Sequence, residues 1–213
     1  MNLILYYAPY ACSLVPLITL REAGADFELR PTNLLKGEQL EPEFLKYNPK
    51  HKVPVLVVDG KPLTENVAIQ TWIAKNFPEA KLLPDDFMDY CQALSLMTWC
   101  ASGIHPTLTP NVKPERYCDL PDTADNVRQC ARKLMLENFA VAEDLLKGRE
   151  YFFDHFTAVD AYFFWCFRRA HDFKVDVSHF QNCGEHFERM KKRESVKAAF
   201  EIEKEVLEKF SNS

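Results

Sequence analysis

The amino-acid pattern changes near residue 80, and this change limits the folds that are open to the chain. Before it, short apolar runs typical of strands alternate with stretches in which apolar residues repeat at helical spacing. Beyond it, no strand-like alternation is convincing, and only the helical period remains. The sequence therefore predicts a small α/β domain over residues 1–80, a linker over 81–86 and an all-α domain over 87–213.

The first segment has the order strand, helix, strand. LILYY (3–7) and FELRP (27–31) are typical of strands, and the helical spacing between them runs over 13–23. Gly24 suits the left-handed position that follows a helix. This order predicts a parallel βαβ unit.

A hairpin and a second helix are predicted next. The Asp-Gly pair at 59–60 separates the strand-like runs 55–58 and 61–64. Both positions of such a turn need positive φ, which this pair tolerates, so the pair is a strong hairpin signal. Helical spacing then predicts a helix over 66–76, with Asn66 as its N-cap.

Only helices are predicted in the second half. The first should end near His105-Pro106, because several prolines follow and each removes a helical N–H donor. Thr157 and Asp160 resemble a capping box, so we expect Asp160 to act in folding and not in chemistry. The predicted helices cover residues 87–105, 123–147, 157–171, 184–193 and 195–210.

Composition narrows the class of protein. The 213 residues carry a formal net charge of −5, which argues against nucleic acid as a partner. No apolar run approaches the length of a membrane span, and MNLILYY lacks the basic start and long apolar stretch of a signal peptide. The seven cysteines are scattered and include no CxxC pair. We therefore expect free thiols in a reducing cytoplasm, no metal and no membrane partner.

Four segments resemble the bacterial beta-type members of the cytosolic glutathione transferase family. They occur in the family's order: YYAPYACSLVPLITLREAG (6–24), NPKHKVPVL (48–56), LTENVAI (63–69) and FTAVDAYFF (156–164). The resemblance implies a thioredoxin-like N-terminal domain followed by a helical domain. It also implies a cytoplasmic homodimer and glutathione as co-substrate.

The resemblance implies binding roles for residues on either side of the predicted hairpin. Pro54 is cis in the family, and the backbone N–H and C=O of Val53 would then be unpaired and meet the cysteinyl part of glutathione as an added strand does. Glu65 would take the ammonium of the γ-glutamyl group, and the N–H of Asn66 would take its carboxylate at a helix start. The family usually has Ser where Asn66 stands.

Three further residues follow from the same resemblance. Lys36 and Lys52 would meet the glycyl carboxylate, although the family usually has glutamine in place of Lys52. His105 stands where beta-type relatives carry a histidine that faces the thiol, as hydrogen-bond donor or general base. Pro106 replaces the family's usual lysine after it.

The Cys-Ser pair is the predicted chemical centre. Cys12 and Ser13 lie at the expected start of the first helix, where the helix dipole and free N–H groups stabilise a thiolate. Two roles remain open: Ser13 donates from its hydroxyl or N–H to the glutathione sulfur, or Cys12 itself forms a mixed disulfide with glutathione. Tyr6, Tyr7 and Tyr10 lie nearby and are assigned no thiol-activating role.

Three functions are therefore weighed. The first is an enzyme that conjugates glutathione to small electrophiles in detoxification. The second is a glutathione-dependent thiol transferase or reductase that depends on Cys12. The third is a binding protein with this fold and no turnover.

Overall fold

The computed structural model describes residues 1–212, which divide into two compact units. The first unit comprises Met1–Leu83 together with the segment from Lys191 onward, and the second comprises Pro84–Met190. The change of unit after Leu83 falls within the predicted linker. The C-terminal segment, however, groups with the first unit, whereas the sequence assigned it to the helical domain.

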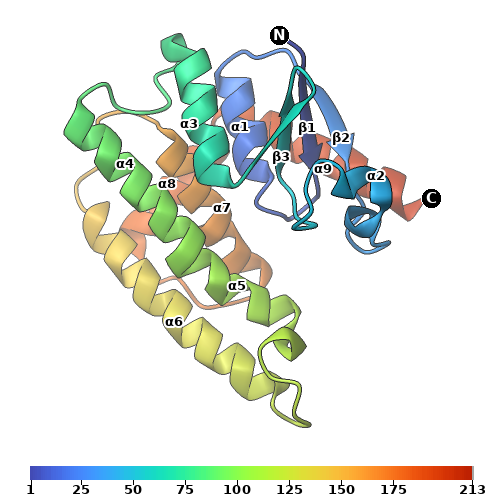
Figure 1. The fold of residues 1–213 in the computed structure, drawn as a ribbon. Helices are drawn as coiled ribbons and strands as arrows, with labels where there is room; N and C mark the ends of the chain where they lie inside the picture. The colour runs from blue at the N-terminus through green and yellow to red at the C-terminus, as the bar shows by residue number, and fades with distance from the viewer. Residues whose placement is uncertain (213) are drawn as a thin grey trace. The chain divides into compact units, whose positions relative to one another are not determined.

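The first unit is built on a four-stranded mixed sheet (Figure 1), in the order β2-β1-β3-β4. Strand β1 pairs parallel with β2 and antiparallel with β3, and β3 pairs antiparallel with β4. This confirms the predicted βαβ unit and hairpin, and Asp59 and Gly60 have φ values of 46° and 83°. The strands are β1 (Leu3–Tyr7), β2 (Glu28–Pro31), β3 (Val55–Val58) and β4 (Lys61–Thr64).

Helix α1 is the centre of the first unit and packs against β1, α3 and α9. Cover on several sides explains why its sequence, LVPLITLRE, has no polar face: every residue from Leu14 to Leu20 is buried. The sequence indicated this helix correctly. The helices of this unit are α1 (Leu14–Glu22), α2 (Pro42–Leu45), α3 (Asn66–Asn76) and α9 (Glu194–Ser211), with 3₁₀ turns at Glu38–Leu40 and Pro78–Ala80.

Helix α9 belongs to the first unit because its apolar face lies on α1 and its N-terminus is tied to the end of α1. Val196, Ala199 and Val206 are buried on that face. The Arg193 guanidinium donates from Nε and Nη2 to the Glu22 carboxylate, each at 2.8 Å. These contacts join residues far apart in sequence, which a reading of local pattern does not reveal.

The second unit contains only helices among the residues described. Helix α7 is its core: from Ala158 to Phe167 every residue is buried, as its nearly uniform apolar sequence predicted. Helices α4 and α5 pack on α7, and α6 packs on α5. The helices are α4 (Phe87–Trp99), α5 (His105–Val112), α6 (Ala124–Leu145), α7 (Ala158–Asp172) and α8 (Gln181–Lys191), with a π-helical segment at Cys100–Ile104 and a 3₁₀ turn at Pro114–Arg116.

The helix predicted to end at His105-Pro106 does not end there. A π-helical segment follows α4, and α5 begins at His105 with Pro106 in its first turn, where a missing N–H costs least. Pro110 lies inside α5 and has no N–H to donate to the Pro106 carbonyl. That carbonyl instead accepts a hydrogen bond from the Tyr117 hydroxyl at 3.4 Å. The prolines therefore do not break the helix: Pro106 lies in its first turn, and the Tyr117 hydroxyl donates where Pro110 cannot.

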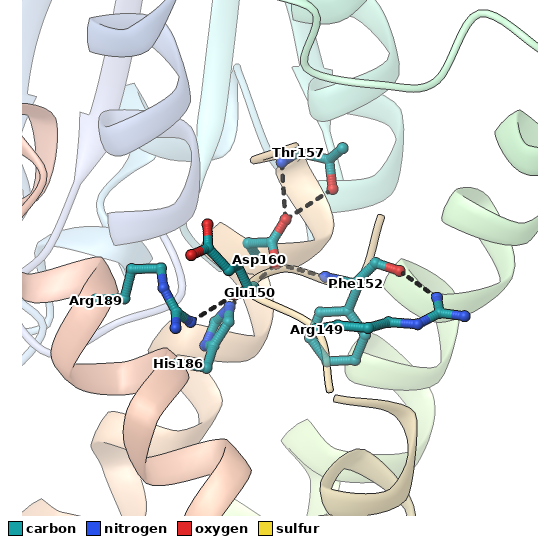
Figure 2. Close-up of polar contacts among 7 residues, drawn as sticks. All are labelled: Arg149, Glu150, Phe152, Thr157, Asp160, His186 and Arg189. Atoms are coloured by element: carbon teal, nitrogen blue, oxygen red, sulfur yellow. Dashed lines mark hydrogen bonds and ion pairs between the residues drawn. The ribbon is translucent and has the colours of Figure 1, made fainter. Parts of the chain in front are cut away.

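The start of α7 is fixed by a buried carboxylate, shown in Figure 2. Asp160 Oδ2 accepts hydrogen bonds from the Thr157 N–H at 2.8 Å and the Thr157 hydroxyl at 3.0 Å. Asp160 Oδ1 accepts from the Phe152 N–H at 3.0 Å and lies 3.0 Å from His186 Nε2. The predicted capping box is confirmed, and the structure adds His186 of α8 as a partner.

A further hydrogen bond ties α8 to the segment before α7, and another lies within that segment (Figure 2). Arg189 Nη1 donates to the Glu150 carbonyl at 2.7 Å, and Arg149 Nη1 donates to the Phe152 carbonyl at 3.3 Å. The core of the second unit is thus cross-linked by polar contacts as well as by aromatic packing. Across residues 1–212, none of the helices combines the length and hydropathy needed to cross a bilayer.

Candidate functional site

The loop between β1 and α1 is closed by Ser13. The fully buried Ser13 hydroxyl donates to the Ala8 carbonyl at 3.2 Å and accepts from the Ala8 N–H at 3.0 Å. Its hydroxyl is therefore engaged in holding the loop. The backbone N–H of Ser13 has no acceptor among residues 1–212, so of the two donors expected at Ser13 the N–H is the available one.

The surroundings of the Cys12 thiol disfavour its deprotonation. It lies two residues before α1, and its Sγ donates to the Val53 carbonyl at 3.6 Å. Burial raises the pKa of the Cys12 thiol to about 12, and the negative charge of Glu65 adds to the rise, against a smaller opposing effect from Lys52. Burial therefore opposes the thiolate expected at the helix start, and a thiolate at Cys12 stays a prediction.

The Val53–Pro54 peptide bond is cis, as the sequence indicated. Of the two Val53 backbone groups expected to be unpaired, the carbonyl accepts from Cys12. The Val53 N–H has no acceptor among the described residues 1–212. The preceding loop is braced by Asn48, whose Nδ2 donates to the Lys52 carbonyl at 2.6 Å.

Glu65 and Asn66 meet at the start of α3. Glu65, and not Asn66, occupies the N-cap position, with φ 72° and ψ 127°. Asn66 is the first helical residue because its buried side chain turns back and donates from Nδ2 to the Cys12 carbonyl at 3.1 Å. Left-handed backbone at a non-glycine residue costs on the order of 1–3 kcal/mol and tends to occur at functional sites. The predicted N-cap at Asn66 is wrong, but the pair does bring this helix start to Cys12.

Two polar groups of Asn66, at this helix start, have no partner within the described chain. They are the Asn66 N–H and the Asn66 Oδ1, the latter buried. An unpaired buried oxygen and an unpaired N–H at a helix start provide hydrogen-bonding capacity for a ligand.

Sequence reasoning missed Lys50. Its ammonium forms an ion pair with the Glu65 carboxylate and donates to Thr64 Oγ1 at 3.0 Å. Fifteen residues separate Lys50 from Glu65. No local pattern links the two, because they meet only when the loop before β3 lies beside the end of β4.

The two lysines predicted for a carboxylate differ in their surroundings. Lys52 is exposed, and its charge acts on the Cys12 thiol. Lys36 is exposed in a turn where its backbone N–H donates to Asn33 Oδ1 at 3.2 Å. Lys52 is therefore near Cys12. A binding role for either lysine stays a prediction.

The nearby tyrosines are held by other groups. The buried Tyr7 hydroxyl donates to Glu203 Oε2 of α9 at 3.1 Å, and the Tyr10 N–H donates to the same oxygen at 2.8 Å. The Tyr6 hydroxyl accepts from Arg30 at 3.2 Å. Glu203 is a second residue that sequence reasoning missed. The signal in the sequence was an acidic residue at a position where the helical period of α9 predicts a buried apolar one.

His105 belongs to the second unit. It is the first residue of α5, and its ring meets the Trp165 ring edge-on with centroids 4.6 Å apart. The contacts that unite Cys12, Val53 and Asn66 all lie within the first unit. A role for His105 in thiol chemistry stays a prediction.

Comparisons with known proteins match a family model to the N-terminal part of the chain and relatives to nearly all of it. The family model for the glutathione S-transferase N-terminal domain matches residues 1–75. The chain is 31% identical to the glutathione S-transferase GstA of Escherichia coli O157:H7, over 93% of this chain and 98% of that protein.

Two solved structures are similar along nearly the whole chain. A sphingomonad glutathione S-transferase in complex with glutathione is 31% identical with a TM-score of 0.83, over 94% of this chain and 98% of that one. A bacterial beta-class glutathione S-transferase from Sphingomonas chungbukensis is also 31% identical, with a TM-score of 0.82 and the same coverage. Within residues 1–212, no cluster of His, Cys, Asp or Glu is suited to a metal ion.

Proposed function

Since the chain belongs to the glutathione S-transferase family, we propose that it conjugates glutathione to small electrophilic compounds and that its first unit binds the tripeptide. Clearance of reactive compounds from the cell is the role that this activity serves. The observation that carries the proposal is the meeting of three backbone features around Cys12. These are the Val53–Pro54 cis bond, the left-handed Glu65 and the start of α3.

The γ-glutamyl group is assigned to the start of α3. Its carboxylate would accept from the Asn66 N–H, which has no other acceptor among residues 1–212. Its ammonium would meet the Glu65 carboxylate, whose side chain is 70% exposed. A helix start favours the anion and the neighbouring acid favours the cation, so one short segment matches both charges of an amino acid.

The remainder of the tripeptide is assigned along the chain from Val53. The cysteinyl carbonyl would accept from the Val53 N–H, as an added strand does. The glycyl carboxylate would meet Lys52, with Lys36 as the second cation. Support for Lys52 is its proximity to Cys12, which its charge influences.

The chemistry requires a glutathione thiolate. Its sulfur attacks the electrophilic carbon, a carbon–sulfur bond forms, and the thiol proton leaves to solvent or a base. The Ser13 N–H would stabilise that thiolate as a hydrogen-bond donor, and His105 is proposed as donor or base from the second unit. Thiol exchange at Cys12 is less well supported, because desolvation raises the pKa of this thiol and so disfavours the thiolate that exchange requires.

Calorimetric titration with reduced glutathione tests the proposal. We expect saturable binding, and strong loss of it in Glu65→Gln, which keeps the side-chain size and removes the charge. Glu43→Gln is the matched control, because the Glu43 side chain is 83% exposed. Among residues 1–212, its ion-pair partner is Lys46. Binding followed by turnover of 1-chloro-2,4-dinitrobenzene supports conjugation. Binding without turnover of any electrophile tested would favour the non-catalytic alternative.

A homodimer in the cytoplasm is part of the proposal. Family membership supports both, and the cytoplasm is also supported by the seven cysteines, none of which forms a disulfide among the described residues. Light scattering coupled to size exclusion tests the assembly: a mass of twice 24.7 kDa is expected.

A further inference from the structure

Lys50 extends from a braced loop. Asn48 Oδ1 accepts from the Lys50 N–H at 3.1 Å, and Asn48 Nδ2 donates to the Lys52 carbonyl at 2.6 Å. Asn48 itself is buried. Hydrogen bonds to the Asn48 side chain therefore hold the backbone on both sides of His51.

The side chain of Lys50 ends on the acid assigned to glutathione. Its ammonium pairs with Glu65 Oε1 and donates to Thr64 Oγ1 at 3.0 Å. The side chains of Lys50 and Glu65 are 48% and 70% exposed. An ammonium group of the chain thus contacts the carboxylate that an ammonium group of the ligand would need.

We propose that the Lys50 ammonium competes with the γ-glutamyl ammonium of glutathione for the Glu65 carboxylate. When glutathione binds, its ammonium displaces Lys50 from Glu65. This inference rests on the proposed function, since it names a residue that tunes affinity at the same site. Thr64 Oγ1 gives the displaced ammonium an acceptor to remain on. Lys50 is therefore a residue that sets affinity and not a catalytic residue.

The size of the effect follows from exposure. Exposed ion pairs contribute little to stability, because water screens them and holding two long side chains costs entropy. Their loss changes an equilibrium constant by about 1.5- to fivefold. Removal of the competitor should thus strengthen glutathione binding by an amount in this range and leave the fold intact.

The experiment compares K50M with the unaltered chain by calorimetric titration with glutathione. Methionine keeps an unbranched apolar stem of similar length and removes the charge. We expect the dissociation constant to fall about 1.5- to fivefold. An unchanged or higher dissociation constant would overturn the proposal, and a higher one would mean that Lys50 assists the ligand carboxylates.

A second ligand separates competition from a general effect of charge. In this analogue of glutathione, hydrogen replaces the α-amino group of the γ-glutamyl residue, so Glu65 has no ammonium to receive. We expect K50M to bind the analogue as the unaltered chain does. Equal gains for both ligands would overturn the proposal, because competition requires the ligand ammonium.

Lys46 provides the matched control. It lies four residues earlier and is paired with Glu43 at 2.5 Å, with side chains exposed at 64% and 83%. K46M should leave the affinity unchanged. If the unaltered chain shows no saturable binding, both the site and the competition are overturned. If it binds glutathione without a gain in K50M, only the competition is.

Discussion

At the scale of single residues, the surroundings of Cys12 and Cys118 shift the pKa values of the two thiols in opposite directions. Cys12 is flanked by Val53 and the start of α3, and its pKa is raised to about 12 chiefly by burial. Cys118 lies in the turn before α6, where a hydrogen bond with Thr123 lowers the pKa of its thiol below the usual range. Because the thiolate is the nucleophile, the two cysteines should differ in reactivity although only one was expected to be reactive.

Alkylation measures this difference within one molecule. Iodoacetamide at pH 7, followed by peptide mass spectrometry over time, should modify Cys118 well before Cys12. Raising the pH should accelerate modification of Cys12 up to the range near its pKa. Cys91, another partly exposed cysteine, serves as an internal reference. Modification of Cys12 ahead of Cys118 at pH 7 would contradict the protonated state described here.

At the scale of elements, helix ends decide how the helices are held. The start of α7 depends on Asp160, which takes hydrogen bonds from Thr157 and Phe152 and faces His186. The start of α9 depends on Arg193, which meets Glu22 at the end of α1. Each carboxylate joins two segments of one unit, so its removal should affect stability more than chemistry.

Replacement of Asp160 should destabilise the protein. In Asp160→Ala the Phe152 N–H and His186 lose their hydrogen-bond partner inside the core, and a buried polar group left without a partner costs about 1–3 kcal/mol. We expect a lower free energy of unfolding in urea and a lower soluble yield. The folded fraction should bind glutathione with normal affinity.

Asp154→Ala controls for the loss of an acid, since the Asp154 side chain is 90% exposed. Stability of Asp160→Ala equal to that of the unaltered chain would contradict the structural role of this carboxylate.

The Glu22 contact predicts a pH dependence of stability. Burial alone would raise the pKa of Glu22, but hydrogen bonds from Arg193 and Ser195 reverse this and leave the pKa below its usual value. A carboxyl group with a lowered pKa stabilises the fold above its unfolded pKa, about 4.3. This stabilisation is lost as the pH falls through the folded pKa.

Urea unfolding at pH 6 and at stepwise lower pH checks this expectation. Glu22→Gln should be less stable at pH 6, and the difference should shrink as the pH falls below about 4.3. Glu43→Gln is the exposed control. A difference that is constant with pH would show that the Glu22 charge does not contribute.

At the scale of the whole molecule, the C-terminal segment supports the loop that leads to Cys12. Glu203 of α9 accepts from the Tyr7 hydroxyl and the Tyr10 N–H, 196 and 193 residues away in sequence. Tyr10 has a φ of 61°, so the loop turns sharply where the carboxylate holds it. The last helix is therefore part of the structure that positions the candidate site.

Substitution of Glu203 tests this support. Glu203→Ala leaves a buried hydroxyl and a backbone N–H without this acceptor, at a cost of about 1–3 kcal/mol for each. We expect lower stability together with weaker glutathione binding. Glu203→Gln retains an acceptor oxygen and should recover part of both. Glu205→Ala, at an exposed position of the same helix, should change neither. Full glutathione affinity in folded Glu203→Ala would separate α9 from the site.

Much of this protein follows from local pattern. The Asp59-Gly60 hairpin, the buried α7 and its capping box follow from residues within a few positions of one another. The βαβ unit follows from the order of its elements, although its strands pair residues 24 positions apart. Pro54 and Glu65 were also found in this way, through short segments shared with a family. The prediction placed the N-cap at Asn66, one residue too late, because a local pattern does not show that the Asn66 side chain bonds to the distant Cys12 carbonyl.

Tertiary structure alone decided the rest. Three features depend on chain segments that meet only after folding. They are the ion pair of Lys50 with Glu65, the hydrogen bonds of Glu203 to the β1–α1 loop and the packing of α9 on α1. The protonation of Cys12 was decided in the same way. Hydration depends on everything packed around a group, and in this chain its loss is the largest influence on the pKa of Cys12.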